Sequence, residues 1–433
     1  MSALELLPLE IWKKVISRVN DPKKLVKLRL VCNLFDQLIE IEMKKNKQWK
    51  ELLPSDMKMW INNILAKKYP FKKLSKLELL PNLWKEAFFS YKNWRLFGDK
   101  SRKIHSFRFN VSQFLQNEKI TCLTTFARFV AVGTNLGLIF FYKIGKLKNF
   151  FWAAKHGNNL TKIQFWYQGK NNILALSTSS DRVLKFWNVS QKKSIVTPHY
   201  NATNIHVGIN HRLFIEFFRG ITECKYISNR VVLKAHCAVF RGDNGPRNNF
   251  LTMYSENEKL IVMTTYDTIL RVITLKVPDP QGTELTEINK KLYRLLPRRP
   301  PVDLALIPNN ELRLFKNGKF FTIIFQGWPN FPIYEYKLYR YEYIFVTSIA
   351  MHVHLLIFGL NTGQIHIYSI KNNFQLMEQP LEFCEVRKLN ISDSPILALS
   401  LTETKSRRYI IAATEVSIHS IYLGKKKSVL AES

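Results

Sequence analysis

Two stretches of eleven residues decide the fold: Val132–Tyr142, VGTNLGLIFFY, and Ser177–Trp187, STSSDRVLKFW. In each, a short turn rich in Asn, Asp, Gly or Ser joins two apolar runs, and this pattern predicts two strands connected by a tight turn. The same frame fits three more stretches: Met263–Ile273, Phe358–Tyr368 and, more weakly, Ala412–Tyr422. The sequence therefore predicts a repeated β-hairpin from about residue 103 onward.

The spacing of these hairpins predicts how many units the chain holds. Their last positions are 142, 187, 273, 368 and 422, so the gaps between them are 45, 86, 95 and 54. Two gaps are near twice 45, and filling them gives seven units, with degenerate units near residues 205–240 and 302–346. An all-β repeat of about 40–45 residues predicts a β-propeller of four-stranded blades. We expect His105–Phe109 to close the ring beside Ser417–Leu423, since a closed ring leaves no open sheet edge.

The second unit resembles a WD repeat. The resemblance rests on His156, Ser177, Ser179, Asp181 and Trp187, with Asn188 where that family has aspartate. It implies a hydrogen-bonded structural tetrad in which the aspartate holds the histidine and the histidine holds a serine hydroxyl. These side chains would then be scaffold rather than catalysts. The other units lack this set, so their blades would depend on apolar packing.

The N-terminal stretch Leu7–Leu38 reads LPLEIWKKVISRVNDPKKLVKLRLVCNLFDQL and predicts three short helices. Proline is tolerated in the first helical turn, and the Asp-Pro pair ends one helix and begins the next. The stretch resembles an F-box in its Leu-Pro-x-Glu-Ile opening, its Asp-Pro turn and its Leu-Val-Cys-x-x-aromatic-x-x-Leu end. Phe35 stands where that family usually has tryptophan.

The F-box resemblance implies docking on the Skp adaptor of an SCF (Skp–cullin–F-box) ubiquitin ligase. The implied adaptor-binding residues are Leu7, Pro8, Ile11, Val31, Cys32 and Leu38. The alternative is an N-terminal three-helix cap that binds no adaptor. Three short helices bury little apolar surface, so a partner helix would complete their core.

Three domains follow from these patterns: an F-box at residues 1–45, a helical linker at 46–102 and a WD-repeat-like β-propeller at 103–433. The linker carries Trp49, Trp60, Trp84 and Trp94 and is similar to the segment that joins F-box to propeller in F-box/WD-repeat proteins. Its tryptophans fit ordinary core positions equally well. A stiff linker would fix the distance between the two modules, and a flexible one would broaden the range of lysines reached.

The net charge is +32, from 65 basic and 33 acidic residues. The first hundred residues carry +10 (21 basic, 11 acidic) and the rest carries +22, so the excess is spread along the chain. An even spread fits biased coding composition, whereas a nucleic-acid reader usually concentrates charge on one face. The second interpretation is a positive surface used on an acidic partner: a phosphopeptide, an acidic protein or RNA.

The compartment is constrained by cysteine usage and by what the N-terminus lacks. Five scattered cysteines with no CxxC favour a reducing compartment over a disulfide framework. No apolar run is long enough for a membrane span, and the first residues do not form a secretory signal. We therefore expect a cytoplasmic or nuclear protein without membrane contact, with Lys425–Lys427 as a weak nuclear address or a solvated tail.

No catalytic motif accompanies these modules. GxGxxG after a strand, GxxxxGK[ST], HExxH and GxSxG are all absent from the sequence. His352 and His354 alternate along an apolar stretch without a neighbouring acid, so no metal site is expected. The polar insertion Pro278–Pro301 is expected to be a surface loop rather than a core strand. We expect no enzyme activity, no cofactor and no metal.

The function that follows is a substrate-recognition subunit of an SCF ubiquitin ligase, in which the F-box binds the Skp adaptor and the propeller binds the protein to be ubiquitinated. Candidate substrate-binding residues at strand-to-strand turns are Lys119, Lys162 and Arg182, for an acidic or phosphorylated segment. The alternative is a basic propeller scaffold that binds RNA or an acidic protein assembly, without a ubiquitination role. Nucleic acid is the less expected partner, since the charge is spread evenly.

Overall fold

The structure is a computed structural model. It describes residues 8–19, 22–29, 31–45, 60–73, 77, 80, 82–111, 117–169, 172–217, 220–228, 230–237, 249–256, 258–266, 269–278, 282–294, 302–310, 312–318, 320–325, 334–337, 343–370 and 384–424.

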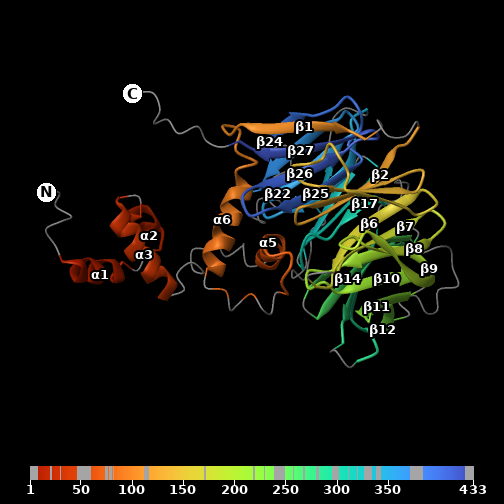
Figure 1. Ribbon diagram of the computed structural model, residues 1–433, viewed down its shortest axis with the longest axis horizontal. Coiled ribbons are helices and arrows are strands. Elements are labelled where there is room, and N and C mark those ends of the chain that lie inside the picture. The colour runs from red at the N-terminus through yellow and green to blue at the C-terminus, as the bar shows by residue number, and fades with distance from the viewer. Residues whose placement is uncertain are drawn as a thin grey trace.

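Three short helices form the N-terminal unit at the left of Figure 1: α1 (Leu9–Ser17), α2 (Pro22–Leu28) and α3 (Asn33–Lys45). Pro8 is the N-cap of α1, and its carbonyl accepts the backbone N–H of Ile11 at 3.0 Å. The helices pack through a small apolar core in which the rings of Trp12 and Phe35 meet edge to face at 4.9 Å. An aromatic ring at position 35 therefore fills the core of this unit.

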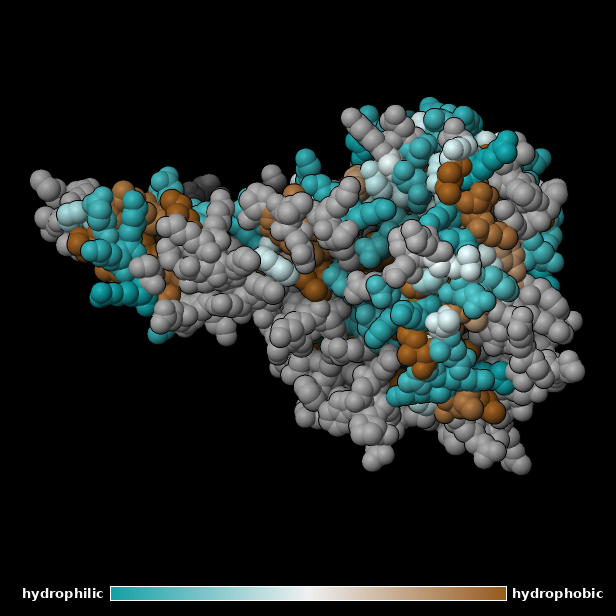
Figure 2. Space-filling view, turned by 90° about the horizontal axis from the view of Figure 1, so that it is seen from below, coloured by the Kyte–Doolittle hydropathy of each residue, from teal (hydrophilic) through white to brown (hydrophobic). Residues whose placement is uncertain are grey.

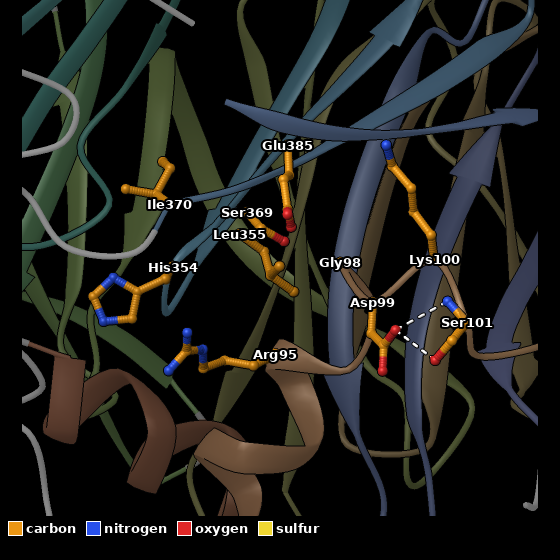
Figure 3. A pocket seen from close by; sticks show the side chains of 10 residues that line it. All are labelled: Arg95, Gly98, Asp99, Lys100, Ser101, His354, Leu355, Ser369, Ile370 and Glu385. Carbon is orange, nitrogen blue, oxygen red and sulfur yellow. Dashed lines mark hydrogen bonds between the residues drawn. The ribbon is translucent and has the colours of Figure 1, made fainter. Parts of the chain in front are cut away.

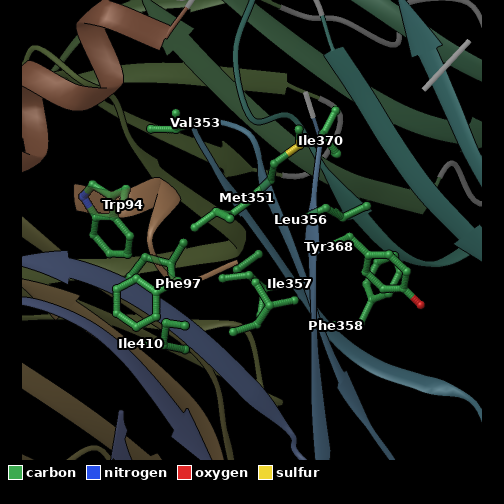
Figure 4. Close-up of a cluster of buried hydrophobic side chains, with 14 of the residues drawn as sticks. Trp94, Phe97, Met351, Val353, Leu356, Ile357, Phe358, Tyr368, Ile370 and Ile410 are labelled. Carbon is green, nitrogen blue, oxygen red and sulfur yellow. The ribbon is translucent and has the colours of Figure 1, made fainter. Parts of the chain in front are cut away.

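Two further helices, α5 (Ile61–Lys68) and α6 (Leu83–Arg95), lie between the N-terminal unit and the sheets (Figure 1). Their apolar faces do not form a separate core. Trp60, Trp94 and Phe97 are fully buried in one cluster with residues of the sheets. Figure 4 shows Trp94 and Phe97 beside Ile410, Met351 and Ile357. The tryptophans at positions 60 and 94 are thus core residues that join the helices to the sheets.

The rest of the described chain is almost entirely antiparallel sheet. One four-stranded sheet has the order β2-β3-β4-β5, from β2 (Ile120–Phe126), β3 (Phe129–Thr134), β4 (Leu138–Lys143) and β5 (Trp152–Lys155). The next sheet has seven strands in the order β12-β11-β10-β9-β8-β7-β6. These are β6 (Leu160–Tyr167), β7 (Ile173–Ser179), β8 (Val183–Asn188), β9 (Lys193–Val207), β10 (Leu213–Phe217), β11 (Gly220–Ile227) and β12 (Arg230–Cys237).

The 15-residue strand β9 explains the seven-stranded sheet. Its first half pairs with β8 and its second half pairs with β10. The strand therefore ends one group of four strands and begins the next.

Four more four-stranded sheets complete the body. They contain β13 (Asn249–Glu256), β14 (Lys259–Tyr266), β15 (Ile269–Lys276) and β16 (Thr286–Arg294); then β17 (Val302–Leu306), β18 (Leu312–Asn317), β19 (Phe320–Phe325) and β20 (Tyr334–Lys337). They continue with β21 (Val346–His352), β22 (Leu355–Leu360), β23 (Gln364–Ser369) and β24 (Glu385–Asn390); and last β25 (Ala398–Glu403), β26 (Arg408–Ala413) and β27 (Ser417–Leu423), joined by β1 (Ile104–Asn110).

The order of contacts between sheets follows the chain. β2 contacts β6, β9 contacts β13, β17 contacts both β13 and β21, and β25 contacts both β21 and β2. In the last sheet, β1 pairs with β27 along its whole length, from Ile104 opposite Leu423 to Asn110 opposite Ser417. The predicted hairpins are all observed, including that of Ser177–Trp187 in β7 and β8. This mostly β architecture of antiparallel four-stranded sheets is compatible with a β-propeller-like domain.

One sequence prediction was wrong. The polar segment Pro278–Pro301 does not form only a loop, because it contains the nine-residue strand β16. β16 is the outermost strand of its sheet and pairs only with β15. An edge strand can expose both faces to solvent, so its polar composition does not exclude strand structure. The exposed side chains of Ile288 and Leu292 belong to this strand.

Candidate functional site

Exposed apolar side chains gather on the N-terminal three-helix unit, where brown and teal residues alternate at the left of Figure 2. They are Leu9, Ile11, Val15, Val31, Leu34 and Ile41. The opposite side of α1 is used internally, since Ile16 is buried against α3 residues. Exposed apolar side chains gathered on so small a unit are typical of a protein-binding surface.

The structure separates the predicted adaptor-binding residues into three groups. Ile11 and Val31 are exposed, with 39% and 54% of their surface accessible, and Pro8 is exposed at the start of α1. Cys32 is half-buried at the rim of the internal core. Leu38 is only 6% exposed and packs inside the unit, so its side chain supports the helices rather than offering a contact surface. Leu7 lies outside the described residues.

The N-terminal unit is fastened to α6. Phe88 of α6 joins the buried core of the three helices, and Trp84 packs at its edge. Lys85 of α6 forms an ion pair with Glu40 of α3 at 2.7 Å. Together, the apolar contact and the ion pair hold the three-helix unit in a fixed orientation relative to α6.

A buried carboxylate fastens the same helix to the sheets. Glu403, at the end of β25, accepts hydrogen bonds from Ser90 Oγ at 2.6 Å and from Trp94 Nε1 at 3.0 Å. Arg408 donates to its other oxygen at 2.7 Å, and Lys68 of α5 lies 3.7 Å from that oxygen. Because two cations and two neutral donors surround it, the buried charge is compensated.

A second carboxylate repeats this arrangement at another sheet. Glu256, at the end of β13, accepts hydrogen bonds from Tyr254 Oη at 2.8 Å and from Asn310 Nδ2 at 2.5 Å. Asn62 of α5 also donates to this carboxylate. Lys67 of α5 donates to the Leu401 carbonyl at 2.6 Å, and burial lowers the pKa of Lys67 to about 8. The linking helices are thus held by polar contacts to two sheets, those of β25 and β13, which favours a stiff linker between the modules.

His352 and His354 serve the same junction. His352 ends β21, whereas His354 lies in the following turn, so the two do not alternate along one strand as expected. The ring of His352 lies 4.9 Å from that of Trp94, and His354 lies 5.8 Å from Tyr91. Burial places the pKa of His352 well below its usual range. In the part of the chain that the structure describes, no cluster of three or more His, Cys, Asp or Glu side chains could hold a metal ion.

The polar set of the second unit forms one continuous chain of hydrogen bonds. Trp187 Nε1 donates to Ser177 Oγ at 2.8 Å, and Ser177 Oγ lies 2.7 Å from His156 Nδ1. His156 Nε2 lies 2.8 Å from Ser179 Oγ, and Ser179 donates to Asp181. Aspartate therefore reaches the histidine through a serine rather than directly as expected, because Ser179 occupies the space between them.

The donor order in this chain fixes the protonation of the histidine. The Asp181 carboxylate can only accept, so the single hydroxyl hydrogen of Ser179 goes to it, and Ser179 Oγ accepts the proton carried by His156 Nε2. Nδ1 of the neutral ring is then an acceptor, and it receives the hydroxyl hydrogen of Ser177, which itself accepts the Trp187 N–H. Burial and nearby Lys185 lower the pKa of His156 to about 4, consistent with this neutral ring. His156, Ser177 and Ser179 are buried and hydrogen-bonded to one another, whereas Asp181 is exposed and also accepts a hydrogen bond from Asn158.

Two asparagines form structural hydrogen bonds that were not predicted from the sequence. Asn135 Oδ1 accepts the backbone N–H of Lys119 at 2.8 Å, and Asn361 Oδ1 accepts that of Phe345 at 2.9 Å. Each asparagine lies in the hairpin turn of its sheet and holds the residue that precedes the sheet's first strand. The available signal was their identical place in the repeat frame, four residues into Val132–Tyr142 and four into Phe358–Tyr368.

Lys119, Lys162 and Arg182 do not form one patch. Lys119 is about half exposed and pairs with Glu415 at 2.9 Å. Lys162 donates to Asn204 Oδ1 at 2.7 Å, and both Lys162 and Arg182 act electrostatically on Glu216. Burial raises the pKa of Glu216 to about 7 despite these cations, and burial lowers the pKa of Lys162 to about 8. Arg182 is exposed in the β7–β8 turn with φ of 64°, so it is the cation of this cluster that faces solvent.

Figure 3 shows a pocket of about 380 Å³ beside the end of α6. Arg95 and Lys100 line it together with Asp99 and Glu385. Asp99 already accepts hydrogen bonds from the backbone N–H and the hydroxyl of Ser101, at 2.9 and 2.7 Å. The pocket thus carries charges of both signs, and one of its carboxylates is already hydrogen-bonded. This lining does not indicate a single class of ligand.

No protein-family model matches this chain, and a search of curated proteins finds no match. Among the described residues, no helix combines the length and the apolar character needed to cross a bilayer.

Proposed function

We propose that this protein is a substrate-recognition subunit of an SCF-type cullin–RING ubiquitin ligase. The N-terminal three-helix unit would act as the F-box that binds the Skp adaptor. The sheets would act as a seven-bladed WD-type propeller that binds the protein to be ubiquitinated. The chain itself would catalyse no step, because its contribution is to hold a target lysine near a charged conjugating enzyme.

The observation that carries the proposal is the exposed apolar surface on a unit with an F-box-like sequence. Ile11 and Val31 stay in solvent although the same unit buries Ile16, Leu25 and Ile39. An adaptor helix seated on this surface would gain roughly 25 cal/mol per Å² of apolar area removed from water. The motif and the surface therefore support the same partner.

The seven-blade proposal is supported by strand pairing. Dividing the seven-stranded sheet at β9 gives two groups of four, and the other five sheets each have four strands. The pairing of β1 with β27 joins the start of the β-region to its last sheet. In such a ring this pairing would act as the closure, since a closed ring leaves no exposed edge between first and last blades.

The linker supports a receptor whose two binding surfaces have a fixed relation. α6 contacts the three-helix unit through Phe88 and the sheets through Trp94, six residues or a little under two helical turns apart, roughly 9 Å along the axis. A target held on the sheets would then keep a constant position relative to the adaptor. This restriction selects which target lysines can be modified.

The experiment is co-purification with the Skp adaptor. We expect wild-type protein to form a stoichiometric complex, and the double variant Ile11→Asp, Val31→Asp to lose it, because charged side chains cannot be buried in an apolar interface without a partner. Leu292→Asp is the matched control, since this residue is 58% exposed on β16, far from the three helices in sequence. Retention of the adaptor by the double variant, or its loss by the control, would reject the proposal.

A further inference from the structure

A groove with basic and aromatic lining lies beside the loop that joins β4 to β5. Its volume is about 540 Å³. Six of its lining residues are Lys143, Lys146, Lys148, Phe109, Phe150 and Phe151. We call this feature the basic groove. It belongs neither to the three-helix surface nor to the cluster around Glu216.

The charges of the basic groove are of one sign. Among the described residues no carboxylate lines it, and Lys143, Lys146 and Lys148 are all solvent-exposed. Within the described chain, neither Lys146 nor Lys148 forms an ion pair, whereas Lys119 of the same sheet region does. Three lysines within six residues repel one another and attract a polyanion.

Aromatic rings form the walls between these charges. Phe150 is half-buried and lies 5.2 Å from Phe140, which fixes the orientation of its ring. Lys143 Nζ lies 5.4 Å from the ring centre of Phe151. Gly145, with φ of 86°, lines the groove, and a side chain built at this position would meet no atom within 4 Å. A flat ligand can therefore approach the backbone at this point.

The aromatic surface continues along β1. Phe107 precedes Phe109 by two residues, so both project from the same face of the strand. Phe107 is exposed and stacks on Tyr422, with ring centres 5.8 Å apart and planes inclined by only 6°. Arg407 lies 4.7 Å over the same tyrosine ring. Cation and aromatic ring thus alternate beyond the groove as they do within it.

We propose that the basic groove binds single-stranded RNA, with bases against the phenylalanine rings and phosphates beside the lysines. Alternating stacking surfaces and cations are the shared chemistry of single-strand binding sites. A lipid surface fits this site less well, because the rings are walls of a concave groove, whereas membrane insertion needs side chains that project. This activity goes beyond the proposed adaptor and substrate binding, and it does not depend on them.

The test measures fluorescence anisotropy of a labelled oligouridylate of about 15 nucleotides with the full chain. We expect the double variant Lys146→Ala, Lys148→Ala to bind about fivefold more weakly and to reduce the salt slope by about 0.7 per lysine removed. The matched control is Lys259→Ala, Lys276→Ala, which removes two exposed lysines that face each other on β14 and β15. Equal losses in the two double variants would show bulk charge only and would overturn the proposal.

A second variant tests stacking. Phe150→Leu keeps an apolar side chain but removes the ring, and we expect binding of the oligouridylate to weaken about fivefold while the melting temperature stays near that of wild type. Unchanged binding by a folded Phe150→Leu protein would overturn the proposal. Sedimentation with phosphatidylserine-containing vesicles provides the other arm. A groove variant that loses vesicle binding but keeps RNA binding would assign the groove to lipid and also overturn it.

Discussion

Trp94 and Glu403 are 309 residues apart in sequence, yet the indole nitrogen of Trp94 donates a hydrogen bond of 3.0 Å to the Glu403 carboxylate. This contact joins a helix that precedes all the strands to the last sheet of the body. The same carboxylate also accepts hydrogen bonds from the Ser90 hydroxyl and the Arg408 guanidinium. The Glu403 side chain therefore accepts hydrogen bonds both from the linker helix and from the sheet. We expect the contact between linker and sheets to be destabilised when this carboxylate is removed.

The first prediction concerns this carboxylate. Glu403→Ala should destabilise the protein by about 3 kcal/mol, because the buried partners of a 1% exposed side chain would be left unpaired. Thermal unfolding measures the loss, and limited proteolysis should show earlier cleavage in the linker. The matched control is Glu415→Ala, whose carboxylate is 43% exposed in its pair with Lys119 and should change stability by less than about 1 kcal/mol. Equal effects of the two substitutions would contradict the proposed role of Glu403.

The second prediction is a loss of stability in acid. Burial lowers the pKa of His206 to about 3 and the pKa of His156, His211, His366 and His419 to about 4. Because an unfolded histidine has a pKa near 6.5, the unfolded chain binds more protons between these values. The contribution of these neutral histidines to the free energy of unfolding should be fully present above pH of about 6.5. It should be lost progressively as pH falls toward about 4.

His156 provides the variant for that test. His156→Gln should flatten the pH dependence of the melting temperature between pH of about 4 and 6.5, since it removes one of the groups that must gain a proton. A His156→Gln protein with the wild-type slope would show that this ring does not contribute.

The β-region was largely predictable because its signals are local. Turn residues such as Asn135 and Asp181 recur in a fixed frame, so hairpins were found even where the strands were irregular. The degenerate units near residues 205–240 and 302–346 were not matched to this frame, although Asn317-Gly318 is itself a turn signal, and only the spacing of their neighbours indicated them. The structure has four-stranded groups in both places.

The candidate sites were less predictable because they depend on pairs distant in sequence. Glu403 and Ser90 carry no motif, so their contact could not be read from either segment alone. Lys119 and Lys162 look alike in sequence, yet one pairs with Glu415 and the other lies among Asn204 and Glu216. Leu38 fits a family pattern, but its burial follows from how α3 packs, which the pattern does not record.

The third prediction concerns two glycines of the hairpin and loop turns. A side chain at Gly363, where φ is 74°, would meet the Ser392 carbonyl oxygen at 1.9 Å. Gly145 has a similar φ of 86° but open space around it. Gly145→Ala should cost only the conformational strain of about 1 kcal/mol, whereas Gly363→Ala should cost more than about 2 kcal/mol. Thermal unfolding of both variants checks this order, and equal losses would show that the turn at Gly363 can relax.

The last prediction is that capture of an acidic peptide at the cluster of Arg182, Lys162 and Glu216 weakens as pH rises from about 6 to about 8. Glu216, with a pKa of about 7, gains its negative charge in this interval, and Lys162, with a pKa of about 8, begins to lose its positive charge. Both changes reduce the net positive charge beside Arg182. An oligoglutamate peptide with an acetylated N-terminus is the probe, because its own charge then stays constant in this range.

Two variants separate the contributions to this pH dependence. Glu216→Gln should keep affinity for the peptide nearly constant from pH of about 6 to 7, because the group that titrates there has been removed. Arg182→Ala should weaken capture at every pH by roughly threefold to fivefold, since it removes the exposed cation of the cluster. Lys119→Ala serves as the matched control, because Lys119 belongs to the separate pair with Glu415. Capture that strengthens with pH in the wild type, or that depends on Lys119 as much as on Arg182, would place peptide binding elsewhere on the sheets.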